Sequence, residues 1–238
     1  MALELARRGY KVAVTARRAE ALESLRAEAA GLRGAIVCYP GDVTDRAGMA
    51  RLVPAIEDHE GAIALAFLNV GTFTPDDAGT FGGDGFRDTF MVNVFGAINC
   101  LGPVLAAMRQ RRKGQIAVTA SVAGYGPLPR ATAYGATKAA LINMMGSLRF
   151  SAEALGLTIQ VVNPGFVRTP LTAQNDFPMP FLVELEDAAR RICDGFERDG
   201  FEITFPRRLS WTLKFLNLLP WSLYFRIVGA ATKGKPGN

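Results

Sequence analysis

The feature that most constrains the fold is a regular alternation of short apolar runs with longer amphipathic stretches. The apolar runs, which predict strands, lie at 11–16, 35–39, 62–68, 115–120, 158–162 and 202–205. Stretches of helical length and spacing occupy 1–8, 19–30, 46–57, 85–110, 133–155 and 185–198. Strands joined by helical crossovers run parallel, with helices packed on both faces. The sequence therefore predicts a doubly wound α/β fold, a Rossmann-like arrangement of three α/β/α layers.

Composition narrows the function classes. The 238 residues fit one domain, and an apolar content of 49% is enough for a large core. We expect the α/β domain to cover 1–206, with an apolar helical extension of the same domain over 207–238. The net charge is +5, and the basic residues form only short clusters that are scattered along the sequence. A nucleic-acid-binding protein would gather its basic residues on one face, so no nucleic-acid partner is expected.

Cysteine and histidine usage points away from a metal site. The three cysteines are far apart in the sequence, and the single histidine, His59, lies in a polar stretch. This spacing is not that of metal ligands, so no metal is predicted. Unpaired cysteines suit a reducing compartment, and we expect a cytoplasmic location.

Three residues form a candidate catalytic set. Tyr134 and Lys138 are four residues apart in a predicted helix, so their side chains share one face. A tyrosine has a pKa of about 10, and a nearby ammonium favours the phenolate and lowers that pKa. Ser121 directly follows the predicted strand 115–120, at the sheet edge where such folds bind ligands. The intervening loop, 122–132, has the length to bring both hydroxyls over a substrate carbonyl.

With this set in place, the chain resembles the short-chain dehydrogenase/reductase family from residue 1 to about 205. Further matches to family motifs are Asp42 and Val43 near the adenine, the segment Asn69, Val70 and Gly71, the helix residue Asn93, and the segment containing Pro164, Gly165, Val167 and Thr169. Taken singly, each residue has a structural explanation, such as a loop cap, a helix-interior polar group or a glycine turn. Their order and spacing favour the functional interpretation.

The resemblance implies hydride transfer between a nicotinamide cofactor and a carbonyl or alcohol substrate. Tyr134 would exchange the proton, and Ser121 would hold the substrate oxygen. Lys138 would lower the pKa of Tyr134 and bind the nicotinamide ribose, while Asn93 would shape its helix and hold a water. Cofactor contacts are implied for Arg17, Asp42, Val43, Asn69, Val70, Gly71, Tyr134, Lys138, Pro164, Gly165, Val167 and Thr169. A homo-oligomer, either a dimer or a tetramer, is also expected.

The end of the second family strand indicates which nucleotide is used. An acidic residue there binds the ribose 2′-hydroxyl of NAD, whereas an arginine accommodates the 2′-phosphate of NADP. Here Ala16 is followed at once by Arg17. A guanidinium pairs well with phosphate, so the sequence predicts NADP(H) as the cofactor.

The opening strand and glycine-rich turn of this fold have no counterpart in the sequence. The chain starts inside a predicted helix that ends at Gly9, and no G-x-G-x-x-G pattern occurs. That strand is central, and the turn supplies N–H groups to the cofactor pyrophosphate. We expect a start site assigned too far downstream. The alternative function is a catalytically silent, truncated remnant, persisting as a folded or partner-stabilised fragment.

The segment 207–230 mixes aromatic residues and cations among leucines. Charges and a proline interrupt it, so it is no clean transmembrane span. Three roles stay open: a peripheral anchor lying in the membrane surface, a cover for the substrate pocket, and an oligomer interface. Each of the three favours an apolar substrate.

Overall fold

The computed structural model describes residues 1–170, 172–174 and 179–232. Its six strands are all parallel to their neighbours and form two sheets, in the orders β1-β2 and β3-β4-β5-β6. Their bounds are Lys11–Val14 for β1, Ala35–Cys38 for β2, Leu65–Leu68 for β3, Gly114–Thr119 for β4, Leu157–Pro164 for β5 and Glu202–Phe205 for β6. Each strand overlaps one of the predicted apolar runs.

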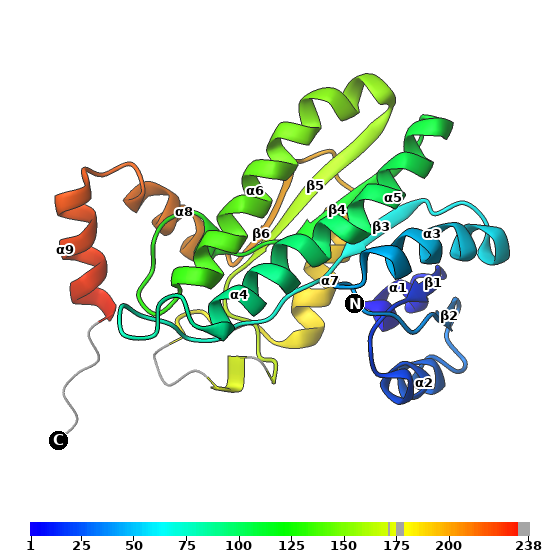
Figure 1. Ribbon diagram of the computed structural model, residues 1–238, viewed down its shortest axis with the longest axis horizontal. Helices are drawn as coiled ribbons and strands as arrows, with labels where there is room; N and C mark the ends of the chain where they lie inside the picture. The colour runs from blue at the N-terminus through cyan, green and yellow to red at the C-terminus, as the bar shows by residue number, and fades with distance from the viewer. Residues whose placement is uncertain (171, 175–178, 233–238) are drawn as a thin grey trace.

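The α-helices in the described part of the chain run between or after these strands (Figure 1). They are α1 (Ala2–Arg7), α2 (Ala19–Glu28), α3 (Arg46–Glu60), α4 (Asp84–Phe90), α5 (Ala97–Arg111), α6 (Thr132–Ala152), α7 (Leu185–Phe196), α8 (Arg207–Leu216) and α9 (Trp221–Thr232). A π-helical segment, Met91–Gly96, joins α4 to α5.

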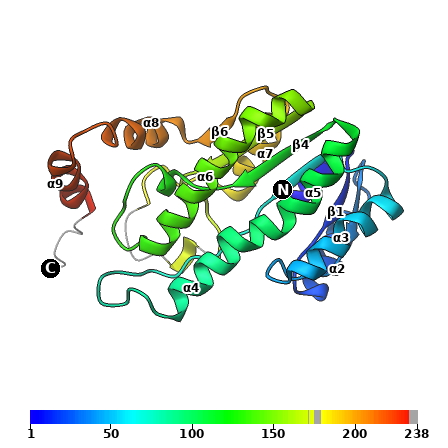
Figure 2. The same cartoon turned by 45° about the horizontal axis from the view of Figure 1, so that its top comes forward.

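Successive side chains of each strand point to opposite faces of the larger sheet, so the buried residues form one core on each face. In β4, Ile116 and Val118 join the main core beneath α5 and α6, whereas Ala117 points to the opposite face and packs with α7. Helices therefore cover both faces, and the doubly wound, three-layer fold is confirmed (Figures 1 and 2).

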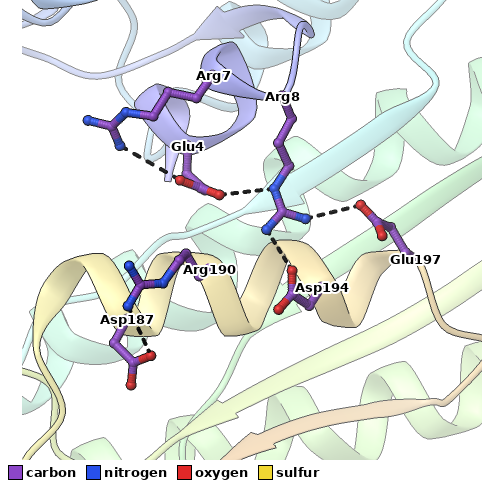
Figure 3. Close-up of polar contacts among 7 residues, drawn as sticks. All are labelled: Glu4, Arg7, Arg8, Asp187, Arg190, Asp194 and Glu197. Carbon is purple, nitrogen blue, oxygen red and sulfur yellow. Dashed lines mark hydrogen bonds and ion pairs between the residues drawn. The ribbon is translucent and has the colours of Figure 1, made fainter.

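The two sheets are not hydrogen-bonded to each other in the described residues. The break lies between β1 and β3, where the order 3-2-1-4-5-6 places its first strand. The expected fold without that strand is thus observed. Packing of α3 against α5 joins the two parts on one face (Figure 2), and α1 lies against α7 on the other (Figure 3).

Charged side chains dominate the contact between α1 and α7 (Figure 3). The Arg8 guanidinium is 3.0 Å from a Glu4 carboxylate oxygen, 2.6 Å from Asp194 and 3.0 Å from Glu197. Gly9 follows in the left-handed region, at φ +92°, and ends the helix as predicted. One arginine thus connects the small sheet's leading helix to the main body.

The continuous helical stretch Asp84–Arg111 is long and apolar enough to cross a membrane by length and composition alone. Its residues Leu101, Val104 and Met108 are buried in the main core. Packing against the sheet therefore accounts for these three apolar side chains. The sequence predicts one regular helix here, and the observed π-helical segment differs because Asn93 is drawn toward another loop, as described next.

Candidate active site

Ser121 and Tyr134 meet at the carboxyl edge of the larger sheet. Ser121 comes directly after β4, and its Oγ accepts a hydrogen bond from the Ala123 backbone N–H at 3.1 Å. This bond fixes the serine at the start of a short 3₁₀ turn. Tyr134 lies in the first turn of α6, and its side chain is close enough to Ser121 for the serine to act on the tyrosine's pKa. Two residues that are 13 apart in the sequence are therefore brought close together.

Lys138 lies one turn further along α6 and is only 2% exposed. Its Nζ donates to the backbone oxygen of Thr119 at 2.9 Å and approaches that of Val70 at 3.5 Å. The same nitrogen is 5.5 Å from the centre of the Tyr134 ring. Burial lowers the pKa of Lys138 to about 8, because an ammonium loses hydration in the interior.

The expected effect of Lys138 on Tyr134 is not found. Burial raises the pKa of Tyr134, and the interaction with Ser121 opposes that rise without cancelling it. Lys138 donates to backbone oxygens, and within the residues that the structure describes no hydrogen bond joins it to the phenol oxygen. Tyr134 therefore keeps its proton at neutral pH in this structure, which corrects the prediction of a lowered pKa.

Asn93 is fully buried within the π-helical segment. Its Oδ1 accepts from the Thr72 N–H at 2.7 Å, and its Nδ2 donates to the Thr72 oxygen at 3.0 Å and to Thr137 Oγ1 at 3.1 Å. Asn93 thus joins the turn after β3 to the helix that carries Tyr134. Its predicted role in shaping the helix agrees with these bonds. Protein groups take both Nδ2 donors, whereas Oδ1 keeps one acceptor position, so the expected water contact stays a prediction.

The turn after β3 passes directly beside Lys138. Asn69 Oδ1 accepts a hydrogen bond from Thr119 Oγ1 at 2.8 Å, which ties the ends of β3 and β4 together. A Cβ on Gly71 would lie 3.4 Å from Lys138 Nζ. The glycine therefore leaves space next to the lysine, and Val70 contributes its backbone oxygen. All three residues follow β3 directly, and their cofactor contacts stay predictions.

The segment after β5 borders the same edge. Gly165 N–H donates to the Phe205 oxygen at 2.7 Å, and a Cβ there would meet Leu209 at 2.9 Å. Close packing thus favours glycine at this position. Pro164 ends β5, and its backbone oxygen lies 3.5 Å from Ser121 Oγ.

Further along this segment the chain turns back on itself. Val167 forms an isolated bridge with Val183, and the Thr169 N–H donates to Thr172 Oγ1 at 2.9 Å. These contacts hold both predicted residues in a fixed turn after β5. Among the described residues, no hydrogen bond joins either of them to Tyr134.

The remaining predicted residues belong to the smaller sheet. Arg17 follows β1 and is exposed, and its charge helps to lower the pKa of Asp42. The main causes of that lowered pKa are hydrogen bonds from the Thr44 backbone N–H and hydroxyl, at 2.9 and 2.8 Å. Val43 offers its backbone oxygen to Asn99 Nδ2 at 2.9 Å. Arg17, Asp42 and Val43 thus lie together, on a different sheet from the catalytic set.

Two residues that sequence reasoning missed bring these parts together. A Cβ on Gly96 would lie 2.8 Å from the Val43 side chain, so this glycine lets the smaller sheet approach the π-helical segment. Asn99, a polar residue in an apolar helix, anchors Val43 from α5. The one sequence feature that could have indicated this contact is the polar side chain of Asn99 within an apolar stretch.

Asp76 is a third missed residue. It is 7% exposed, and its two carboxylate oxygens accept from the backbone N–H groups of Thr132 at 2.6 Å and Ala133 at 2.8 Å. These are orphan donors of the first turn of α6, so Asp76 caps the catalytic helix from a distant loop. Nothing in the local sequence pattern indicates this contact.

The loop between Ser121 and Tyr134 is held by the C-terminal helices. The Tyr125 hydroxyl donates to Glu202 at 2.7 Å, and Lys214 of α8 pairs with the same carboxylate. Burial raises the pKa of Glu202, but hydrogen bonds from Lys214, Tyr125 and Asn163 outweigh it, so the net pKa is lowered. From α9, the buried Tyr224 donates to the Pro127 oxygen at 2.7 Å.

A surface cavity of about 640 Å³ lies between α7, β6 and α8. Arg191, Thr204 and Trp211 are among its lining residues, and Ser121, Tyr134 and Lys138 are not. It is therefore distinct from the catalytic set. No cluster of potential metal ligands occurs in the described part of the chain.

Comparisons with known proteins identify the family. A family model described as short chain dehydrogenase matches residues 1–178. A Myxococcus xanthus protein described as an uncharacterized oxidoreductase is 34% identical over 224 residues, which cover 94% of this chain and 88% of the relative. The chain belongs to the short-chain dehydrogenase/reductase family of oxidoreductases.

Solved structures show the same fold at lower identity. A short-chain dehydrogenase from Sphingobium yanoikuyae in complex with NADPH superposes with a TM-score of 0.78 at 21% identity, covering all of this chain (100%) and 91% of that one. ElxO with NADP bound gives 0.76 at 23% identity over 85% of this chain and 90% of its own.

Proposed function

We propose that this protein is an NADP(H)-dependent oxidoreductase that interconverts a carbonyl and an alcohol group on an apolar substrate. The observation that carries the proposal is the placement of Ser121 beside Tyr134, with the buried Lys138 Nζ 5.5 Å from the centre of the tyrosine ring. Such a pair of hydroxyls at a strand edge is suited to hold and protonate a carbonyl oxygen. The bound cofactor would supply or accept the hydride.

The chain's own residues have distinct tasks in this reaction. Ser121 would donate a hydrogen bond to the substrate oxygen and position it against Tyr134. In reduction, Tyr134 would pass its hydroxyl proton to that oxygen as negative charge develops there. The raised pKa of Tyr134 ensures that this proton is present at neutral pH. In oxidation the proton would return to the phenolate, so that direction should accelerate as the pH rises.

Residues at both ends of the site suit a phosphorylated dinucleotide. An ammonium has three N–H donors, and Lys138 uses two on the oxygens of Thr119 and Val70, which leaves one for a ribose hydroxyl beside Gly71. At the other end, the Arg17 guanidinium is exposed and suited to a 2′-phosphate. NADP in the solved structures of two similar folds supports the same choice.

The oligomeric state, the substrate and the location of this protein stay predictions. A homo-oligomer is supported by exposed apolar side chains one turn apart along the helical stretch Asp84–Arg111, namely Met91 (44%), Phe95 (49%) and Ile98 (40%). A small-molecule substrate and a cytoplasmic location remain as inferred from the sequence. An apolar substrate is favoured because α8 and α9, which hold the Ser121–Tyr134 loop, are rich in apolar residues.

Nucleotide titration tests the proposal directly. The intrinsic fluorescence of NADPH and NADH is followed as protein is added, and turnover is then measured with a series of ketones and aldehydes of increasing apolar size. We expect tighter binding of NADPH. Arg17→Ala should weaken NADPH binding roughly 10- to 100-fold, the loss typical of a charged hydrogen bond, and leave NADH unaffected. Arg18→Ala, which changes the neighbouring exposed arginine, is the matched control.

Two results would contradict the proposal. Tighter binding of NADH would reject the nucleotide assignment. Absence of nucleotide binding and of turnover, in protein that is folded by circular dichroism, would instead support the silent fragment.

A further inference from the structure

The outer faces of α8 and α9 are apolar and exposed. Five large side chains there are more than half exposed: Trp211 (68%), Phe215 (65%), Leu218 (81%), Trp221 (60%) and Phe225 (57%). We call this set the C-terminal apolar surface. The first three are spaced at i, i+4 and i+7, so they lie on one side of α8 and its following turn. The rings of Trp221 and Phe225 stack, with centroids 5.6 Å apart.

Packing within the chain does not account for these side chains. The inner faces of the same helices are already used, because Ser210, Tyr224 and Val228 are buried there. By contrast, the solvent-facing side of α7 carries charged residues such as Asp187 and Arg190, as is normal for a surface helix. Exposed apolar patches bounded by polar groups mark sites of contact with another surface.

The charge of this segment indicates which surface that is. After Glu202 the sequence contains six cations, Arg207, Arg208, Lys214, Arg226, Lys233 and Lys235, and no acidic residue. Arg207, Arg208 and Arg226 are exposed and form no ion pair with any described residue. Tryptophan and phenylalanine side chains favour the boundary between lipid headgroups and acyl chains, and nearby cations favour anionic headgroups.

From this combination we propose that the C-terminal apolar surface docks the protein on an anionic phospholipid bilayer. A second copy of the chain is a poorer partner. A two-fold contact would place the surface against itself, and the same arginines would face each other with no acid to pair them. The described part of α9 lies at the far end of the molecule from the β1-β2 sheet, so docking there leaves that sheet uncovered (Figures 1 and 2).

Docking would also bring lipid close to the candidate active site. The same two helices hold the loop between Ser121 and Tyr134, through the pair of Lys214 with Glu202 and the bond from Tyr224 to Pro127. A substrate dissolved in the bilayer would therefore have a short path to the site. The docking inference itself does not depend on the proposed chemistry.

Vesicle binding of the full chain tests the inference without nucleotide or substrate, so its outcome is separate from that of the activity assays. The protein is sedimented with vesicles of phosphatidylcholine alone and of phosphatidylcholine with one third phosphatidylserine. Both tryptophans of the chain belong to the C-terminal apolar surface, so their emission reports directly on it. We expect binding to the anionic vesicles, a blue shift of the emission, and quenching by brominated lipid.

Variants separate the apolar and electrostatic contributions. Replacing Trp211 and Phe215 by serine should abolish binding to the anionic vesicles. Replacing Arg208 and Arg226 by glutamine should weaken it about tenfold or more, since each cation near an anionic surface contributes roughly fivefold. Phe150→Ser removes an apolar side chain that is 88% exposed on α6 and should leave binding unchanged. All five positions are exposed, so thermal melts should confirm intact folding.

Several outcomes would overturn the inference. One is binding that is absent, or equal for neutral and anionic vesicles. Another is an equal loss of vesicle binding in the Phe150→Ser control and in the variant that replaces Trp211 and Phe215. If sedimentation without lipid shows an oligomer that this variant dissociates, and no vesicle binding occurs, the surface is an interface between copies.

Discussion

The two sheets of this protein differ in how they are stabilised. In the β3–β6 sheet, Val118 and Val161 are wholly buried within a core that also takes in α5 and α6. The β1-β2 sheet has a separate cluster of only three buried residues, Ala6, Ala29 and Ile36. A two-stranded sheet is marginal by itself. The comparison indicates that the smaller sheet depends on its attachments to the larger one.

The candidate functional groups are divided in the same way. Ser121, Tyr134 and Lys138 belong to the β3–β6 sheet and its helices, whereas Arg17 and Asp42 follow the strands of the smaller sheet. Chemistry and nucleotide choice are thus assigned to different parts of the molecule. A dinucleotide spanning both would be an additional attachment between them, and its binding should stabilise the folded state.

The largest expected effect separates these two roles. Tyr134→Phe removes the proton donor from the β3–β6 part, and turnover should fall by about 10²- to 10⁴-fold, the usual contribution of general acid catalysis. The NADPH dissociation constant should stay unchanged, because the ring and its neighbours remain. Steady-state kinetics and fluorescence titration measure the two quantities. Tyr10→Phe, an exposed tyrosine of the smaller part, is the control. Retained turnover would remove Tyr134 from its role.

Core truncations test the difference in packing. Leu141→Ala empties a fully buried position of the main core and should lower the free energy of unfolding by about 2–5 kcal/mol. Leu22→Ala, at a 4% exposed position of α2, should instead speed hydrogen exchange of the β1-β2 amides and spare β4 and β5. Equal acceleration in both sheets would show one cooperative unit and refute the comparison.

The buried Lys138 should make the stability of the β3–β6 part depend on pH. The pKa of Lys138 is lowered from 10.5 to about 8 on folding, so between these values the unfolded chain binds more protons. Stability should therefore rise as the pH increases from 8 to 10.5, by up to about 3 kcal/mol from this residue. Chemical denaturation across that range measures the slope. Lys138→Met should flatten it, and an unchanged slope would contradict the burial effect.

The smallest expected effect concerns the contact between α1 and α7, which attaches the smaller sheet to the larger one. Arg8→Gln breaks the bonds to Asp194 and Glu197 that join α1 to α7, and should cost about 1 kcal/mol, since partly exposed ion pairs contribute little. The loss should appear as faster amide exchange in β1 and β2. Arg190→Gln, which removes an ion pair internal to α7, should leave that exchange unaltered. Added salt should reproduce the Arg8 effect in the unmodified protein.

Much of the fold was predictable because its signals are local. All six strands lie within three residues of the predicted bounds at each end, since apolar runs between turn residues need no tertiary information. The spacing of Tyr134 and Lys138 on one helix face was predictable for the same reason. The π-helical segment was not, because Asn93 bonds to Thr72, which lies 21 residues earlier.

The sequence by itself therefore determined the order of the elements and the family, and it identified the candidate catalytic set. Tertiary structure decided how those groups behave. It set the raised pKa of Tyr134, the partners of Lys138, and the capping of α6 by Asp76 from 56 residues away. The physical reason is that periodicity is written in neighbouring residues, whereas burial and hydrogen-bond partners depend on groups brought together only by folding.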